Sequence, residues 1–173
     1  MGLLILTLGS CKGQPVKGKG EATSPAANKN QEDSGNPSMA SNQGALHIGK
    51  ADFLKLIMDF EKNPDTWTYK GEIPCIVDFY ADWCAPCRIT SPILEEMARE
   101  YSGKIIVYKV DIEKDRELAA IFGVQSIPTF LFCPMEGNPT ISSGIANTPD
   151  ATRDMFRDQI EQILLKKGSS TNL

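Results

Sequence analysis

Two cysteines placed three residues apart carry the strongest chemical signal in this sequence. Cys84 and Cys87 enclose Ala85 and Pro86 and lie just after an apolar run. If a helix begins here, the two cysteines face each other across one turn, close enough for their sulfur atoms to form a disulfide. The free N–H groups and the dipole of a helix N-terminus also favour a thiolate. We therefore expect Cys84 to be an exposed, reactive thiol and Cys87 to be the more buried resolving thiol.

A zinc site is the main alternative for a Cys-x-x-Cys pair. Structural zinc needs about four nitrogen or sulfur ligands, so this pair would supply only half of a site. The sequence has no second Cys-x-x-Cys, and Cys75, Cys133 and His47 each stand alone. We therefore expect no metal and no other cofactor, with the Cys84–Cys87 disulfide itself as the redox group.

The composition argues against several other classes of function. The formal net charge is −4 and the sequence has no basic stripe, which gives no support to nucleic-acid binding. A single histidine, His47, leaves little room for a histidine-rich metal site or a Ser-His-Asp triad. Five cysteines in 173 residues are too few for a disulfide scaffold, and an odd number cannot all pair within the chain.

The first residues suggest export and lipid attachment. Leu3 to Leu8 are mainly apolar, and Gly9 and Ser10 lead into Cys11, which resembles a bacterial lipobox. We interpret residues 1–11 as a signal and lipobox segment in which Cys11 is lipidated. No lysine or arginine precedes the run, and the run is shorter than a usual signal core, so an apolar N-terminus without such a role stays open.

Residues 12–44 have the composition of a disordered tether. They are rich in Gly, Ser, Pro, Asn, Gln and Lys and contain no aromatic residue. Such a stretch cannot bury enough apolar surface to offset the entropy lost on ordering. A tether would hold a domain away from a membrane while letting it reach partners, although a plain tail has the same composition.

Residues 45–168 read as one α/β domain, followed by a short tail over 169–173. The apolar run over 75–81 is typical of a strand buried on both faces, with Asp78 in its middle. Pro92 should kink the helix that follows. Strands that alternate with helices predict a mixed central sheet flanked by helices on both faces. The expected helices are Ala51–Lys62, Cys84–Tyr101, Arg116–Phe122 and a final one that Thr148 caps and Gly168 ends; the expected strands are Cys75–Ala81, Ile105–Val110, Thr129–Cys133 and Thr140–Ser143.

The run from Val77 to Cys87 resembles the active-site signature of the thioredoxin family. The later Ile127-Pro128-Thr129 matches a second part of that signature, and the resemblance covers residues 49–166. It implies the thioredoxin fold and a monomeric thiol–disulfide oxidoreductase that acts on disulfide-bearing proteins and exchanges electrons with an upstream redox partner. The leader and tether make the chain look most like the periplasmic, membrane-tethered members from Gram-negative bacteria. This places the protein in the periplasm rather than the cytoplasm, with a lipid on Cys11 as its only membrane contact.

The resemblance also implies a role for individual residues. Asp78 matches a buried acid beneath the resolving cysteine; burial raises the pKa of such a carboxyl, which could then take the proton of Cys87. Lys109 matches a lysine that modulates this acid. Pro128 matches a cis-proline facing the cysteine pair. The remaining residues implied to contact the substrate are Trp83, Ala85, Pro86 and Ile127. A core aspartate with a hydrogen-bond partner, a solvated lysine and a plain aromatic are the alternatives for Asp78, Lys109 and Trp83.

The chain departs from the family pattern at two positions near the cysteines. Ala85 replaces a usual glycine and Tyr80 replaces a common tryptophan. The residues between the cysteines tune thiolate stability and the redox potential, and Pro86 with no histidine beside it favours a reductase. A periplasmic disulfide oxidase or isomerase and a cytochrome-maturation thiol reductase stay open as alternatives.

Cys75 and Cys133 lie outside the signature. If the strands that hold Asp78 and Thr129 run antiparallel side by side, Cys75 lies opposite Cys133. They are then either two buried, inert thiols or a reversible second pair.

Overall fold

The computed structural model describes residues 44–166, which form an α/β domain built on one five-stranded sheet. The strand order is β1-β3-β2-β4-β5. The strands are β1 (Leu46–His47), β2 (Cys75–Tyr80), β3 (Ile106–Asp111), β4 (Thr129–Cys133) and β5 (Thr140–Ser143). The helices are α1 (Lys50–Leu56), α2 (Ala85–Glu100), α3 (Arg116–Ile121) and α4 (Pro149–Gln159), which continues as a π-helical turn, Ile160–Leu164.

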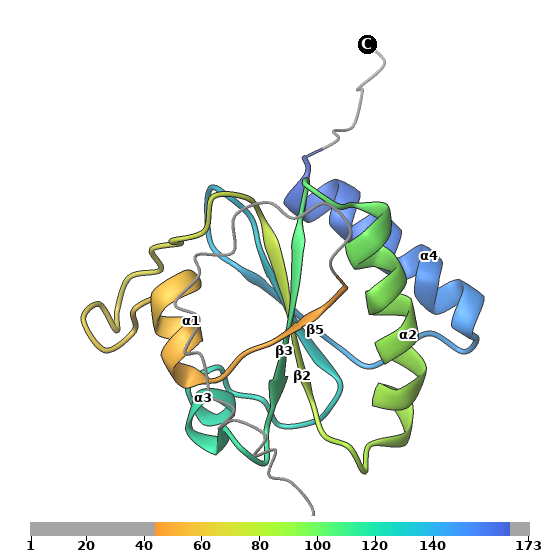
Figure 1. Ribbon diagram of the computed structural model, residues 1–173, viewed down its shortest axis with the longest axis horizontal. Helices are drawn as coiled ribbons and strands as arrows, with labels where there is room; N and C mark the ends of the chain where they lie inside the picture. Colours follow the sequence, from red (N-terminus) through yellow and green to blue (C-terminus); the bar gives the residue numbers. More distant parts are fainter. Residues whose placement is uncertain (1–43, 167–173) are drawn as a thin grey trace, which may run out of the picture. The chain divides into compact units, whose positions relative to one another are not determined.

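The sheet is mixed and covered on both faces, as predicted. Strands β1, β3 and β2 run parallel, β4 pairs antiparallel with β2, and β5 pairs antiparallel with β4. Helices α1 and α3 lie on one side of the sheet, and α2 and α4 lie on the other (Figure 1). All six residues of β2 are buried, which explains why its sequence is apolar almost throughout.

Alternate residues of the central strands contribute to two separate hydrophobic cores, one on each face of the sheet. On the α2–α4 side, Ile76 and Phe130 pack with Phe156, and the Phe130 and Phe156 rings meet edge to face with centroids 4.8 Å apart. On the other side, Phe79 of β2 belongs to one core cluster with Phe53 of α1 and Leu118 of α3. The period of two along each strand therefore assigns every β2 side chain to one of the two helical layers.

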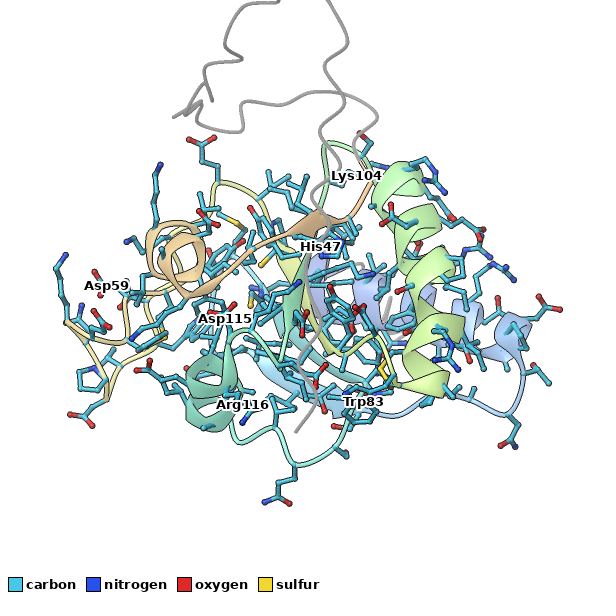
Figure 2. The ribbon with its side chains drawn as sticks, turned by 60° about the horizontal axis from the view of Figure 1, so that its bottom comes forward. His47, Asp59, Trp83, Lys104, Asp115 and Arg116 are labelled. Atoms are coloured by element: carbon cyan, nitrogen blue, oxygen red, sulfur yellow. A yellow bond between two sulfur atoms is a disulfide. The ribbon has the colours of Figure 1, made fainter. Side chains whose placement is uncertain are left out.

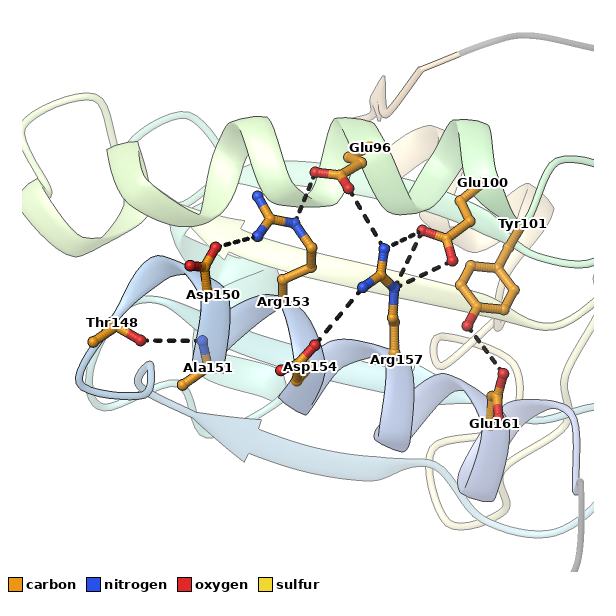
Figure 3. Close-up of polar contacts among 10 residues, drawn as sticks. All are labelled: Glu96, Glu100, Tyr101, Thr148, Asp150, Ala151, Arg153, Asp154, Arg157 and Glu161. Atoms are coloured by element: carbon orange, nitrogen blue, oxygen red, sulfur yellow. Dashed lines mark hydrogen bonds and ion pairs between the residues drawn. The ribbon is translucent and has the colours of Figure 1, made fainter.

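Helix α4 is joined to α2 by ion pairs that run along both helices (Figure 3). Arg153 Nε lies 3.0 Å from Glu96 Oε2, and Arg157 Nη2 lies 2.9 Å from Glu100 Oε2. The predicted cap is confirmed, because Thr148 Oγ1 accepts a 3.1 Å hydrogen bond from the amide of residue 151. The C-terminal part of α2 is thereby joined to α4, while the N-terminus of α2 carries the cysteine pair.

The structure corrects the sequence predictions at the first helix and the first strand. We expected a helix over Ala51–Lys62, but α1 ends at Leu56. Ile57, Met58 and Phe60 are buried through the turns that follow, so their apolar spacing imitated a longer helix. The two-residue strand β1 was not predicted, since it is too short to show a period. The second predicted strand, Ile105–Val110, is observed one residue further along the chain, as β3.

Some predictions concern residues 1–43 and 167–173, which lie outside the described residues. They include the signal and lipobox segment with Cys11, almost all of the tether over 12–44, the stop at Gly168 and the tail over 169–173. Within residues 44–166, none of the helices has the length and apolar character that a membrane crossing requires.

Candidate active site

The cysteine pair lies at the N-terminus of α2, as its sequence position predicted. Cys84 is the N-cap residue, and its Sγ accepts a 3.2 Å hydrogen bond from the backbone N–H of Cys87. Pro86 fits the first helical turn, where its missing N–H would have no partner. Cys84 and Cys87 form a disulfide, with Cα atoms 5.2 Å apart. Cys84 Sγ therefore caps the helix, and the Cys87 amide points at the sulfur that would become the thiolate after reduction.

The prediction that Cys84 is exposed is wrong for this disulfide form. Cys84 is 3% exposed and Cys87 is 1% exposed, so their order is as predicted but both are buried. Tyr80 forms one apolar cluster with the two cysteines, and Ile127 packs against that cluster. These neighbours help to bury the disulfide.

Asp78 is the buried acid of the site. It is fully buried in β2, and burial raises its pKa from 3.8 to about 7, although Lys109 acts in the opposite direction. Neither carboxylate oxygen has a hydrogen-bond partner within the described part of the chain. Within the described residues, Asp78 is therefore not a core aspartate held by a hydrogen bond, which was the alternative interpretation. A carboxyl with a pKa near 7 can both hold and release a proton under physiological conditions.

Lys109 lies opposite Asp78 in the parallel pairing of β2 with β3. It is 6% exposed, so the alternative of a solvated strand lysine is wrong. Its Nζ donates a 2.7 Å hydrogen bond to Ser91 Oγ and lies 4.7 Å from the centroid of the Tyr80 ring. Its positive charge favours the ionised form of Asp78 and so limits the rise of that pKa. The modulating role stays a prediction.

The residues implied to contact the substrate surround the start of α2. Trp83 is 63% exposed and lies beside the disulfide (Figure 2). Ala85 is exposed, and Pro86 and Ile127 are half-buried. The Ile127–Pro128 peptide bond is cis, as expected, and Pro128 itself is buried. The structure brings these residues to one end of the sheet, while their roles in binding stay predictions.

Two contacts of the site escaped the sequence analysis. The Tyr80 hydroxyl and His47 Nδ1 are 3.1 Å apart, and their rings meet edge to face with centroids 5.7 Å apart. In the sequence, His47 stands alone, with no other candidate ligand or site residue near it. Ser91 was also missed, because nothing in its sequence context indicates that Lys109 reaches it. Only the pairing of β1 with β3 brings His47 to the site.

The two remaining cysteines of the described region occupy the opposite side of the sheet. Cys75 pairs with Cys133 across β2 and β4, which confirms the predicted register. Both are free and fully buried, and burial raises the pKa of the Cys133 thiol well above its ordinary value. Among residues 44–166, no cluster of three or more His, Cys, Asp or Glu side chains has the arrangement of a metal site.

Comparison with known proteins gives a consistent match. The family model described as Thioredoxin matches residues 58–157. A thioredoxin of Borreliella burgdorferi is 40% identical over 114 residues, which cover 66% of this chain and 96% of that protein. A chloroplastic M-type thioredoxin of Spinacia oleracea is 37% identical over 105 residues, 59% of this chain and 55% of that protein. A thioredoxin of Haemophilus influenzae is 37% identical over 86 residues, 50% of this chain and 70% of that protein.

Proposed function

The chain belongs to the thioredoxin family, and from this premise we propose that its thiol–disulfide oxidoreductase activity runs as reduction of protein disulfides, with Cys84 attacking and Cys87 resolving. The observation that carries the proposal is the Cys84–Cys87 disulfide at the start of α2, with the Cys87 amide directed at Cys84 Sγ. The redox group is this disulfide, which needs no further cofactor.

In the first step, the Cys84 thiolate attacks one sulfur of a substrate disulfide. A bond forms between that sulfur and Cys84 Sγ, the substrate S–S bond breaks, and the second substrate sulfur leaves as a thiolate. The N–H groups at the start of α2 favour the Cys84 thiolate, and the exposed Trp83 offers an apolar surface beside it.

In the second step, Cys87 attacks Cys84 Sγ and releases the other substrate sulfur. Cys87 must lose its proton first, and Asp78 is the group we propose to accept it. Asp78 lies on the α2 side of β2, two residues before the Tyr80 that contacts both cysteines. The substrate leaves with both electrons and takes up two protons, and the Cys84–Cys87 disulfide returns. An upstream redox partner must then reduce it again.

Matched serine variants test the two thiol roles. Cys87→Ser removes the resolving thiol, so it should accumulate mixed disulfides with substrate through Cys84, visible on a non-reducing gel. Cys84→Ser removes the attacking thiol and should give neither mixed disulfides nor reduction of insulin. Trapping by the Cys84 variant instead of the Cys87 variant would reverse the assignment.

A titration of the purified protein against glutathione tests the direction of exchange. A reductase should equilibrate near −270 mV, the value of thioredoxin itself. An equilibrium near −120 mV, the value of a strong disulfide oxidant, would refute the reductase assignment.

We also propose that the protein works in the periplasm, attached to a membrane by a lipid on Cys11. The support is the lipobox-like sequence before Cys11 and the tether composition that follows. Expression in a Gram-negative host with a radiolabelled fatty acid should label the wild-type chain but not the Cys11→Ser variant. A wild-type chain that stays unlabelled and in the cytoplasmic fraction would overturn this part of the proposal.

A further inference from the structure

A row of three titratable side chains crosses the sheet beneath the cysteine pair. His47 on β1 lies opposite Lys109 on β3, and Lys109 lies opposite Asp78 on β2. Partners in register on neighbouring strands point to the same face of a sheet, which here is the face covered by α2. The row therefore runs from the exposed His47 to the fully buried Asp78.

Tyr80 connects this row to the disulfide. It ends β2, two residues after Asp78, and so projects from the same face. It belongs to one buried apolar cluster with Cys84 and Cys87, and the Lys109 ammonium lies 4.7 Å from the centroid of its ring. Its hydroxyl reaches across β3 to His47 Nδ1, 3.1 Å away. The residue is only 8% exposed, so the His47 contact is the one that anchors the polar end of the ring.

We propose that His47 is a positioning residue for thiol–disulfide exchange, because its bond to the Tyr80 hydroxyl holds the Tyr80 ring against both the cysteine pair and the Lys109 ammonium. The inference rests on the exchange activity proposed above for Cys84 and Cys87. His47 touches neither sulfur within any contact described, and it acts through Tyr80 alone. A ring held in place keeps the Lys109 ammonium between Tyr80 and Ser91, from where its charge acts on Asp78.

Loss of the hydrogen bond between His47 and Tyr80 should free the Tyr80 ring and, through Lys109, change the ionisation of Asp78. A Tyr80 ring free to turn no longer confines Lys109, which can then turn toward water. Asp78 would lose part of the attraction that favours its carboxylate, and it would accept the Cys87 proton only at higher pH. Other charges also face Tyr80 and stay in place in this experiment. They are Asp82, Asp111 and Lys114.

The test compares variants that differ only in this bond. His47→Leu removes the ring nitrogen, and Tyr80→Phe removes the hydroxyl while keeping the ring. His47→Asn keeps a polar atom near the place of Nδ1 and serves as the rescue variant. For each, the rate of insulin reduction is measured from pH 5.5 to 9, and thermal unfolding confirms that the variant is folded.

One hydrogen bond corresponds to a factor of roughly 2 to 12 in an equilibrium or a rate. We expect His47→Leu and Tyr80→Phe each to slow reduction at pH 7 by a factor in this range and to move the pH profile upward. Their combination should be no slower than either alone, because both remove the same bond, and His47→Asn should restore the wild-type profile. A His47→Leu profile equal to wild type, or a His47→Asn profile as altered as that of His47→Leu, would overturn the inference. A wild-type protein without reductase activity would instead refute the proposed function.

Discussion

Asp78→Asn should remove a pH-dependent loss of stability that the buried carboxyl imposes on the fold. Asparagine has nearly the same shape and cannot ionise. In the wild-type protein, the pKa of Asp78 rises from 3.8 in a solvated chain to about 7 in the fold, chiefly because burial disfavours the charged form. The folded state therefore holds a proton that the unfolded state has already released between these two values.

The direction and size of the change in the free energy of unfolding follow from proton linkage. Where the native state binds more protons than the unfolded state, the free energy of unfolding falls as pH rises. The wild-type protein should lose about 1.4 kcal/mol for each pH unit between pH 4 and pH 7, relative to the variant. Above pH 7 the difference should level off at roughly 4 kcal/mol in favour of Asp78→Asn. At pH 4 both side chains are neutral, so the two proteins should be nearly equal.

Urea unfolding curves at closely spaced pH values from 4 to 8.5 measure this difference directly. Both proteins are kept in the disulfide form, so that ionisation of Cys84 and Cys87 does not enter. Asp65→Asn, which removes an exposed carboxyl, controls for the change in net charge. If the difference between Asp78→Asn and wild type stays constant over this pH range, Asp78 ionises at no cost and cannot act as the buried proton acceptor described above.

Three further predictions follow from the same contacts. Lys109→Met removes the positive charge that favours ionised Asp78, so the pKa of Asp78 should rise above 7. The pH profile of insulin reduction by this variant should therefore lie at higher pH than that of the wild-type protein. Thr148→Ala removes the side chain that caps α4 and should lower the free energy of unfolding by about 1 kcal/mol, measured in urea, whereas Thr148→Ser should retain the cap. Phe156→Ala empties a fully buried position against Phe130 and should cost about 3–5 kcal/mol in the same assay.

The parts of the site that follow one another along the chain could be predicted from the sequence. Asp78, Cys84 and Cys87 belong to one continuous segment, in which a buried strand ends and a helix begins. The register of Cys75 with Cys133 also followed from counting outward along two apolar runs. In each case a local pattern, repeated over several residues, determines where the side chain lies.

Contacts that depend on a very short strand or on the way a helix crosses the sheet could not be predicted in this way. His47 reaches Tyr80 only because a two-residue strand pairs with β3, and no period can be seen in two residues. Lys109 bonds to Ser91 on a helix that packs over its strand, which depends on how α2 crosses the sheet. The early end of α1 has the same origin, since burial of Met58 and Phe60 comes from the packing of the turns after the helix.

The two cysteine pairs of the described region show how the environment, rather than residue type, decides reactivity. Cys75 and Cys133 face the α1–α3 layer of the sheet, where burial holds the pKa of the Cys133 thiol well above its ordinary value. Deprotonation of Cys133 is therefore suppressed, and a thiol that stays protonated is a poor nucleophile. Cys84 is also buried in the disulfide form, yet its sulfur accepts a hydrogen bond from an N–H in the first turn of a helix, which is an environment that favours negative charge.

Burial raises the pKa of Asp78 as well, and there the effect suits the proposed role, because an acid that keeps its proton to about pH 7 can exchange it with Cys87. The same apolar interior thus keeps the Cys133 thiol protonated and raises the pKa of Asp78, the carboxyl that we propose as the proton acceptor for Cys87.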